Sequence, residues 1–69
     1  MDIRRRVGLN IKAARSAKGW SQEELADRAE LHRTYISGLE RGVRNPTVTV
    51  LEKVARALDI VPGRLLDSA

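Results

Sequence analysis

Three side chains with nucleic-acid chemistry stand at the start of one predicted helix, over residues 33–40. Arg33 carries a planar fork of N–H donors that matches the O6 and N7 acceptors of guanine in a DNA major groove. Thr34 and Ser37 carry hydroxyls that can donate to a base edge or to a phosphate. The alternative for Arg33 is a solvated cation, but the positive end of a helix dipole disfavours that placement. The predicted base-reading residues are His32, Arg33, Thr34 and Ser37.

Other residues around that helix suit a sugar–phosphate backbone. Arg41, Arg44 and Asn45 follow the helix in a loop, and such contacts position a protein on DNA without reading its sequence. The alternative is a solvated loop. Tyr35 can reach a phosphate with its hydroxyl or cover the core with its ring. Gly38 costs the helix about 1 kcal/mol relative to alanine, which indicates close approach either to DNA or to another helix.

Catalysis and metal binding find no comparable support. The 69 residues contain no cysteine and one histidine, His32, so only scattered carboxylates remain as metal ligands. No glycine-rich phosphate loop and no nucleophile set with a credible pocket are present. We therefore expect no enzyme, no cofactor, no metal and no small-molecule ligand. No apolar run is long enough for a membrane span, and the expected location is cytoplasmic.

The charge is unevenly distributed along the chain. The formal net charge of +4 is by itself a weak indication of an anionic partner. Residues 1–20 carry six basic side chains and one acidic, residues 21–30 carry one basic and four acidic, and residues 31–46 carry three basic and one acidic. A surface built from the first and third segments would be basic. The acidic segment is expected to face elsewhere.

Apolar residues recur at helical spacing through the chain, and no segment alternates long enough for a strand. Gly19 ends the first predicted helix. Ser21 and Glu24 form a capping box, in which the hydroxyl takes a backbone N–H and the carboxylate reaches back. The predicted helices span 3–18, 22–29, 33–40, 48–58 and 62–67. The expected fold class is all-α, a compact bundle of four to five short helices in one domain over residues 1–69.

Two of these helices form a predicted helix-turn-helix over about residues 22–41. Three residues join them, and the small Ala26 lets the two helix axes approach closely. The second helix of this motif enters the major groove by its N-terminal residues. His32, Arg33, Thr34, Ser37 and Gly38 would then lie on the outward face of that helix, and Ile36 would belong to the core.

Four blocks of the chain resemble the XRE/Cro-like helix-turn-helix family, which includes phage repressors and the controller proteins of restriction–modification systems. The blocks are Trp20 to Ala26, Leu31 to Ser37, Leu39 to Gly42 and Arg44 to Thr47. In its small size and in the block from Leu31 to Ser37 the chain most resembles the controller proteins. The resemblance covers Val7 to Leu66. It implies a lambda-repressor-like fold and a transcription regulator, such as a repressor, that binds a palindromic double-stranded DNA operator.

The resemblance also implies roles for individual residues. It implies a phosphate contact at Gln22, supported by Ser21, where free backbone N–H groups at a helix start form an anion site. It pairs Arg15 with Glu40 as a structural ion pair that orients the second helix of the motif. The family usually has glycine at the first turn position. This chain has Glu30 there, which costs about 1 kcal/mol if the backbone is left-handed.

A chain this short has a marginal core and often gains stability from a partner subunit. The last two predicted helices carry more apolar residues than a small core needs, so we predict a homodimer with a two-fold interface within residues 58–67. The predicted interface residues are Ile60, Val61, Arg64 and Leu65. The alternative function is a protein–protein adaptor, an antirepressor or antitoxin-like partner with the same fold. Arginines around an uncharged helix face favour DNA, because an adaptor would more often present an apolar or acidic face.

Overall fold

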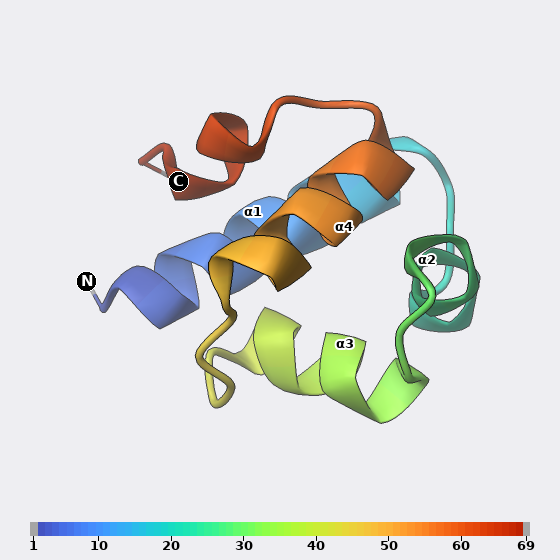
Figure 1. Ribbon diagram of the computed structural model, residues 1–69, viewed down its shortest axis with the longest axis horizontal. Helices are drawn as coiled ribbons and strands as arrows, with labels where there is room; N and C mark the ends of the chain where they lie inside the picture. The colour runs from blue at the N-terminus through green and yellow to red at the C-terminus, as the bar shows by residue number, and fades with distance from the viewer. Residues whose placement is uncertain (1, 69) are drawn as a thin grey trace.

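The computed structural model describes residues 2–68, and this part of the chain contains helices and no strand (Figure 1). In chain order the elements are α1 (Ile3–Ala17), α2 (Gln22–Ala29), α3 (Arg33–Arg41), α4 (Val48–Leu58) and the 3-10 helix η1 (Pro62–Leu66). The predicted all-α class is confirmed, and each predicted helix is present. α1 ends one residue earlier than predicted, and α3 continues one residue further.

Side-chain caps fix where α2 and α4 begin. The Ser21 hydroxyl accepts the backbone N–H of Glu24 at 3.0 Å. The reciprocal half of the predicted capping box is absent, because the Glu24 carboxylate accepts from Arg28 Nε at 2.6 Å instead. Opposite charges four residues apart lie on the same face of a helix, so this pair competes with the cap. The Thr47 hydroxyl caps α4 by accepting the N–H of Val50 at 3.1 Å.

The start of α1 carries a carboxylate that offsets the arginines of its first turn. The Asp2 carboxylate accepts hydrogen bonds from Arg4 Nε at 3.1 Å and from the backbone N–H of Arg4 at 2.8 Å. These side-chain and backbone hydrogen bonds lower the pKa of Asp2 to about 2, from an ordinary value of 3.8. The negative charge also lies at the positive end of the helix dipole, where it is stabilising.

The last helix is shorter and tighter than predicted. The sequence predicts a helix over 62–67, and the structure has a 3-10 helix over Pro62–Leu66. A segment of five residues can close few of the hydrogen bonds that make an α-helix favourable, so a 3-10 turn is the common form at this length.

The helices enclose one apolar core, with α1 between α3 and η1. α1 packs against both of them, and α4 packs against α2 and η1. α3 lies along the lower edge of the molecule in Figure 1, with no other helix beneath it. The buried apolar residues are Val7, Ile11, Leu25, Ala26, Ala29, Ile36, Leu39, Val54, Ala55, Leu58 and Leu65. α3 is therefore held from one side and open on the other.

The close crossing of α1 and α3 depends on Gly8. A methyl group on the Gly8 Cα would overlap the carbonyl oxygen of Leu39 and lie 2.7 Å from that of Glu40. Because these are backbone atoms, they cannot give way as a flexible side chain can. The sequence predicts close helix approach at Ala26 and makes no prediction for Gly8, although a glycine inside a helical pattern is a sign of close packing.

The prediction that Leu65 belongs to a dimer interface is wrong. Its side chain is 0 % exposed in the single chain, where it completes the core beneath η1. Asn10 fastens this end of the chain to α1, since its Nδ2 donates to the carbonyl oxygens of Leu65 and Asp67 at 2.9 and 2.7 Å. A second chain therefore has no accessible surface of Leu65 to contact. No helix within residues 2–68 is both long and apolar enough to cross a bilayer.

Candidate nucleic-acid interface

A three-residue turn joins α2 to α3 and sets the direction of α3. Glu30 adopts φ 58° and ψ 44°, the left-handed region. Its N–H donates to the carbonyl oxygen of Asp27 at 3.2 Å, and the N–H of Leu31 donates to that of Ala26 at 2.8 Å. The backbone at this position is left-handed, so Glu30 bears a steric cost of about 1 kcal/mol where glycine would bear none.

The first turn of α3 presents the predicted base-reading residues to solvent. His32 is the N-cap residue with an extended backbone, and its side chain makes no capping hydrogen bond. Arg33 and Thr34 are exposed and Ser37 is half-buried, whereas Ile36 on the opposite face is fully buried. Arg33 forms no ion pair among residues 2–68. Its guanidinium is available to a partner.

A hydrogen-bonded network behind α3 ties that helix to α1 and α2. The Glu40 carboxylate accepts from Arg15 Nε at 2.7 Å and from Arg15 Nη2 at 3.0 Å. The same carboxylate accepts from Gln22 Nε2 at 3.0 Å, and Arg15 Nη1 donates to the carbonyl oxygen of Trp20 at 2.7 Å. Arg15 and Glu40, which the family resemblance pairs, are thus in bidentate contact. The hydrogen bonds to Glu40 raise the pKa of the Arg15 guanidinium.

Burial of this pair changes the charge that α3 shows to solvent. The side chains of Arg15 and Glu40 are 13 % and 3 % exposed. Glu40 is the only carboxylate between residues 31 and 46. Because it is buried and neutralised from behind, the exposed charges of α3 and its following loop are all positive. We call this exposed face of α3 and its loop the α3 surface. Its exposed cations are Arg33, Arg41 and Arg44.

The start of α2 lies beside this surface and keeps donors free. Ser21 uses its oxygen as an acceptor in the cap, so its hydroxyl hydrogen remains available. Gln22 uses one amide N–H on Glu40, and its second amide hydrogen has no partner among the described hydrogen bonds. Backbone N–H groups at a helix start favour an anion. The arrangement suits the phosphate contact predicted there.

The loop after α3 places Arg44 against the helix, whereas Arg41, predicted in that loop, is the last residue of α3. Arg41, Arg44 and Asn45 are all exposed. The Arg44 side chain lies across Gly38, where an added methyl group would lie 2.6 Å from Arg44 Cγ. The three atoms nearest to such a methyl group all belong to Arg44, so the closest contact at this glycine comes from the loop and not from another helix. The Arg44 Cζ lies 5.4 Å from the centre of the Tyr35 ring, a contact that no sequence pattern indicates.

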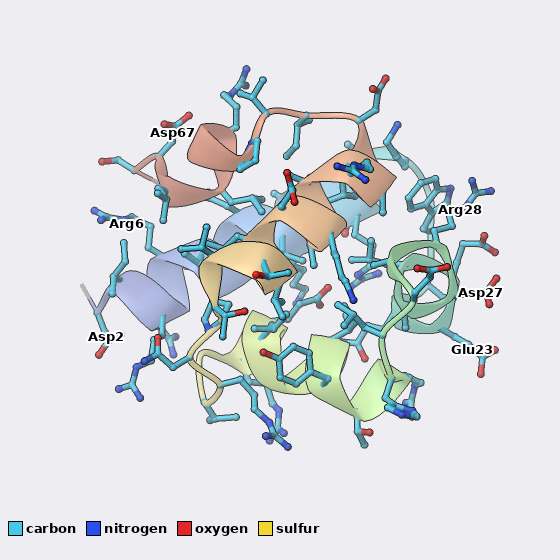
Figure 2. All side chains as sticks on the ribbon, in the orientation of Figure 1. Asp2, Arg6, Glu23, Asp27, Arg28 and Asp67 are labelled. Carbon is cyan, nitrogen blue, oxygen red and sulfur yellow. The ribbon has the colours of Figure 1, made fainter. Side chains whose placement is uncertain are left out.

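Two carboxylates of the acidic segment lie away from α3 as expected, whereas Glu30 lines a surface hollow together with His32, Thr34 and Arg44. Glu23 and Asp27 project outward from α2 into solvent (Figure 2). Arg28 on the same helix stacks over the Trp20 ring at 4.4 Å from its centre. Trp20 is half-buried and packs on the core, so it serves the fold. A phosphate backbone at the α3 surface would not meet the Glu23 and Asp27 carboxylates directly.

The remaining predicted interface residues lie at the opposite end of the molecule from α3, on and before η1 (Figure 1). Val61 is 66 % exposed, Ile60 is half-buried, and Arg64 is exposed and pairs with Asp67 at 3.3 Å. Leu66 is 46 % exposed but lies elsewhere, beside Ile3 and Pro46. Ile60 and Val61 therefore provide an accessible apolar surface here without Leu65 or Leu66.

Comparison with known proteins gives consistent matches over this whole arrangement. Residues 11–66 match a family model described as helix-turn-helix. Control protein C.BamHI of Bacillus amyloliquefaciens is 45 % identical over 67 residues, which covers 96 % of this chain and 83 % of that protein.

Two solved structures have the same fold as this chain. The restriction–modification controller protein C.AhdI of Aeromonas hydrophila superposes with a TM-score of 0.88 and 44 % identity, and the match covers 90 % of this chain and 94 % of C.AhdI. The biofilm regulator SinR in complex with DNA superposes with a TM-score of 0.84 and 42 % identity, and the match covers 88 % of this chain and 98 % of that chain.

Proposed function

The chain belongs to the helix-turn-helix family, and on that basis we propose that it is a DNA-binding transcription regulator that reads its site with α3. The relatives named above are controller proteins and a regulator solved with DNA, which supports this function. In this motif the second helix enters the major groove by its N-terminal residues. Here that helix is α3, whose first turn is exposed.

One observation carries the proposal: the exposed charges of α3 and the loop that follows it are all positive. Its three guanidinium groups are exposed, and the only carboxylate of residues 31–46 is buried against Arg15. A surface of this kind attracts the phosphate backbone by releasing counterions, which gives affinity that falls steeply with salt. Hydroxyls and one free guanidinium fork at the start of α3 then provide base contacts.

We assign two classes of contact to these residues. Arg33 reads a guanine, with His32, Thr34 and Ser37 beside it at the base edges. A bidentate contact of this kind discriminates by about 1–3 kcal/mol against the wrong base. The residues proposed to hold the phosphate backbone are Ser21, Gln22, Tyr35, Arg41, Arg44 and Asn45. Those contacts set position and affinity without discriminating between sequences.

We also propose that the protein binds a palindromic operator as a homodimer. The exposed apolar surface that includes Val61, with Ile60 and Arg64 beside it, would form the two-fold interface. Two α3 helices would then enter successive major grooves, about 34–36 Å apart. The controller proteins among the relatives make a controller role the first context to test.

The experiment is selection from a pool of random DNA duplexes, followed by anisotropy titration of the selected duplex and a scrambled one. We expect an inverted repeat to be enriched. Arg33→Ala should lower the preference for the selected duplex by about tenfold or more. Arg41→Ala should weaken binding of both duplexes alike and flatten the dependence of affinity on salt.

The matched control is Arg56→Ala, which removes the same charge from α4, outside the α3 surface. The Arg56 side chain is 79 % exposed and pairs with Glu52 at 3.6 Å. This variant should bind both duplexes nearly as the parent protein does. If no duplex is enriched at low salt, or if all three variants lose affinity equally, the proposed function is refuted.

A further inference from the structure

The loop after α3 folds back over the end of that helix and brings Arg44 onto it. The backbone N–H groups of Val43 and Arg44 donate to the carbonyl oxygen of Gly38 at 3.0 and 3.3 Å. A methyl group on Gly38 would lie 2.6 Å from Arg44 Cγ, 3.4 Å from its Nε and 3.5 Å from its Cδ. The Arg44 side chain therefore occupies the space that any other residue at position 38 would need.

The guanidinium end of the same side chain is held by an aromatic ring. Arg44 Cζ lies 5.4 Å from the centre of the Tyr35 ring, within the range of a cation–π contact. Tyr35 precedes Gly38 by three residues, so both lie on one face of α3. Stem and cation are thus both fixed along the helix, although Arg44 itself belongs to the loop.

We propose that Gly38 and Tyr35 are positioning residues that hold Arg44 in a binding-ready conformation on the α3 surface. The inference rests on the proposed DNA-binding function and explains how that surface is preorganised. A free arginine must be ordered when it binds a phosphate, and a side chain that is already ordered avoids this cost. Among the amino acids only proline is less favourable in a helix than glycine. The helix nevertheless has a glycine at the position where the Arg44 side chain needs room.

The structure favours this role over the other reasons for a glycine in α3. A methyl group on Gly38 would have all three of its nearest atoms in Arg44, so the loop arginine, and not a neighbouring helix, makes the closest contact at the glycine. Direct approach of DNA to the bare backbone is the competing reason. The two differ in a measurable way, because only the positioning role acts through Arg44.

The test is a double-mutant cycle on DNA affinity with Gly38→Ala, Arg44→Ala and the double variant, using the selected and scrambled duplexes. Gly38→Ala should raise the dissociation constant for both duplexes by about two- to tenfold. In the Arg44→Ala background the same substitution should have no effect. The thermal unfolding midpoint of the Gly38→Ala variant should stay equal to that of the parent protein or rise, because alanine favours the helix. A merely structural glycine would give a lower midpoint.

A second pair of variants tests the ring. Tyr35→Phe keeps an aromatic face for Arg44 and removes only the hydroxyl, so it should weaken binding less than Tyr35→Leu. Tyr35→Leu removes both the face and the hydroxyl and should weaken binding at least as much as Gly38→Ala. If the Phe variant loses as much affinity as the Leu variant, the hydroxyl contacts DNA directly and the positioning role of Tyr35 is overturned.

The outcomes separate this inference from the proposed function. If the parent protein binds no duplex, the proposed function fails and the inference fails with it. If the parent binds but Gly38→Ala weakens binding equally with and without Arg44, DNA approaches Gly38 directly, and only the positioning role is overturned. Loss of the effect in the Arg44→Ala background supports it.

Discussion

Replacement of Arg15 by methionine tests how strongly the buried network holds α3. Glu40 accepts three hydrogen bonds, and two of them come from Arg15 at 2.7 and 3.0 Å. Arg15→Met removes both and leaves a carboxylate that is only 3 % exposed with Gln22 as its remaining partner. Methionine fills much of the same volume, so the loss is mainly electrostatic.

The expected cost follows from that burial. Removing one partner of a buried ion pair costs about 3–5 kcal/mol, because the other charge stays buried without compensation. Arg15 is somewhat exposed and Gln22 still donates one bond, so we expect about 3 kcal/mol. A domain of this size is stable by about 3–10 kcal/mol. The variant should therefore be close to its unfolding threshold.

Urea unfolding followed by circular dichroism at neutral pH measures this cost. The double variant Arg15→Met with Glu40→Met should recover much of the lost stability, since an apolar pair can replace a buried ion pair at little cost. Arg56→Met is the matched control, because its pair with Glu52 is exposed and should contribute less than about 1 kcal/mol. If Arg15→Met costs no more than Arg56→Met, or if the double variant is no more stable than Arg15→Met, the network does not stabilise the fold as argued.

Three further predictions concern other parts of the chain. An NMR titration should give a pKa of about 2 for Asp2, whose stabilising effect is present above pH 3.8 and is lost as the pH falls through 2. Asp2→Asn should flatten the loss of stability over that window. Glu30→Gly should raise the free energy of unfolding by about 1 kcal/mol, and Asp59→Gly, at a similar φ of 59°, should gain less because aspartate tolerates this region better. Val61→Glu should abolish self-association in sedimentation equilibrium, whereas Val48→Glu, at an even more exposed valine, should leave it intact.

Local patterns were sufficient for the helices and for the position of the turn. Apolar spacing and capping residues such as Ser21 and Thr47 act within a few residues, and the structure places these helix starts as predicted. The left-handed turn at Glu30 follows from the family resemblance. These features could be predicted because their causes lie close together in the chain.

Features that depend on distant contacts could not be predicted in the same way. The predicted α-helix over residues 62–67 does not determine which of Leu65 and Leu66 is buried. In the structure a 3-10 helix turns Leu65 into the core and leaves Leu66 exposed. The contact of Gly8 with α3 depends on two segments about thirty residues apart. The position of Arg44 on Gly38 depends on how one loop folds back. Sequence spacing carries no direct information on any of these.

The net charge of a segment is a poor measure of the electric field that a ligand meets. Burial of the Arg15–Glu40 pair removes one positive charge from the exposed surface of α1 and one negative charge from that of α3. Arg4 is further offset by Asp2. The basic character expected of residues 1–20 is therefore weakened, while that of α3 and its loop is strengthened. Because clustered charge steers an anionic partner before contact, the ion pair that orients α3 also directs the positive field toward that helix.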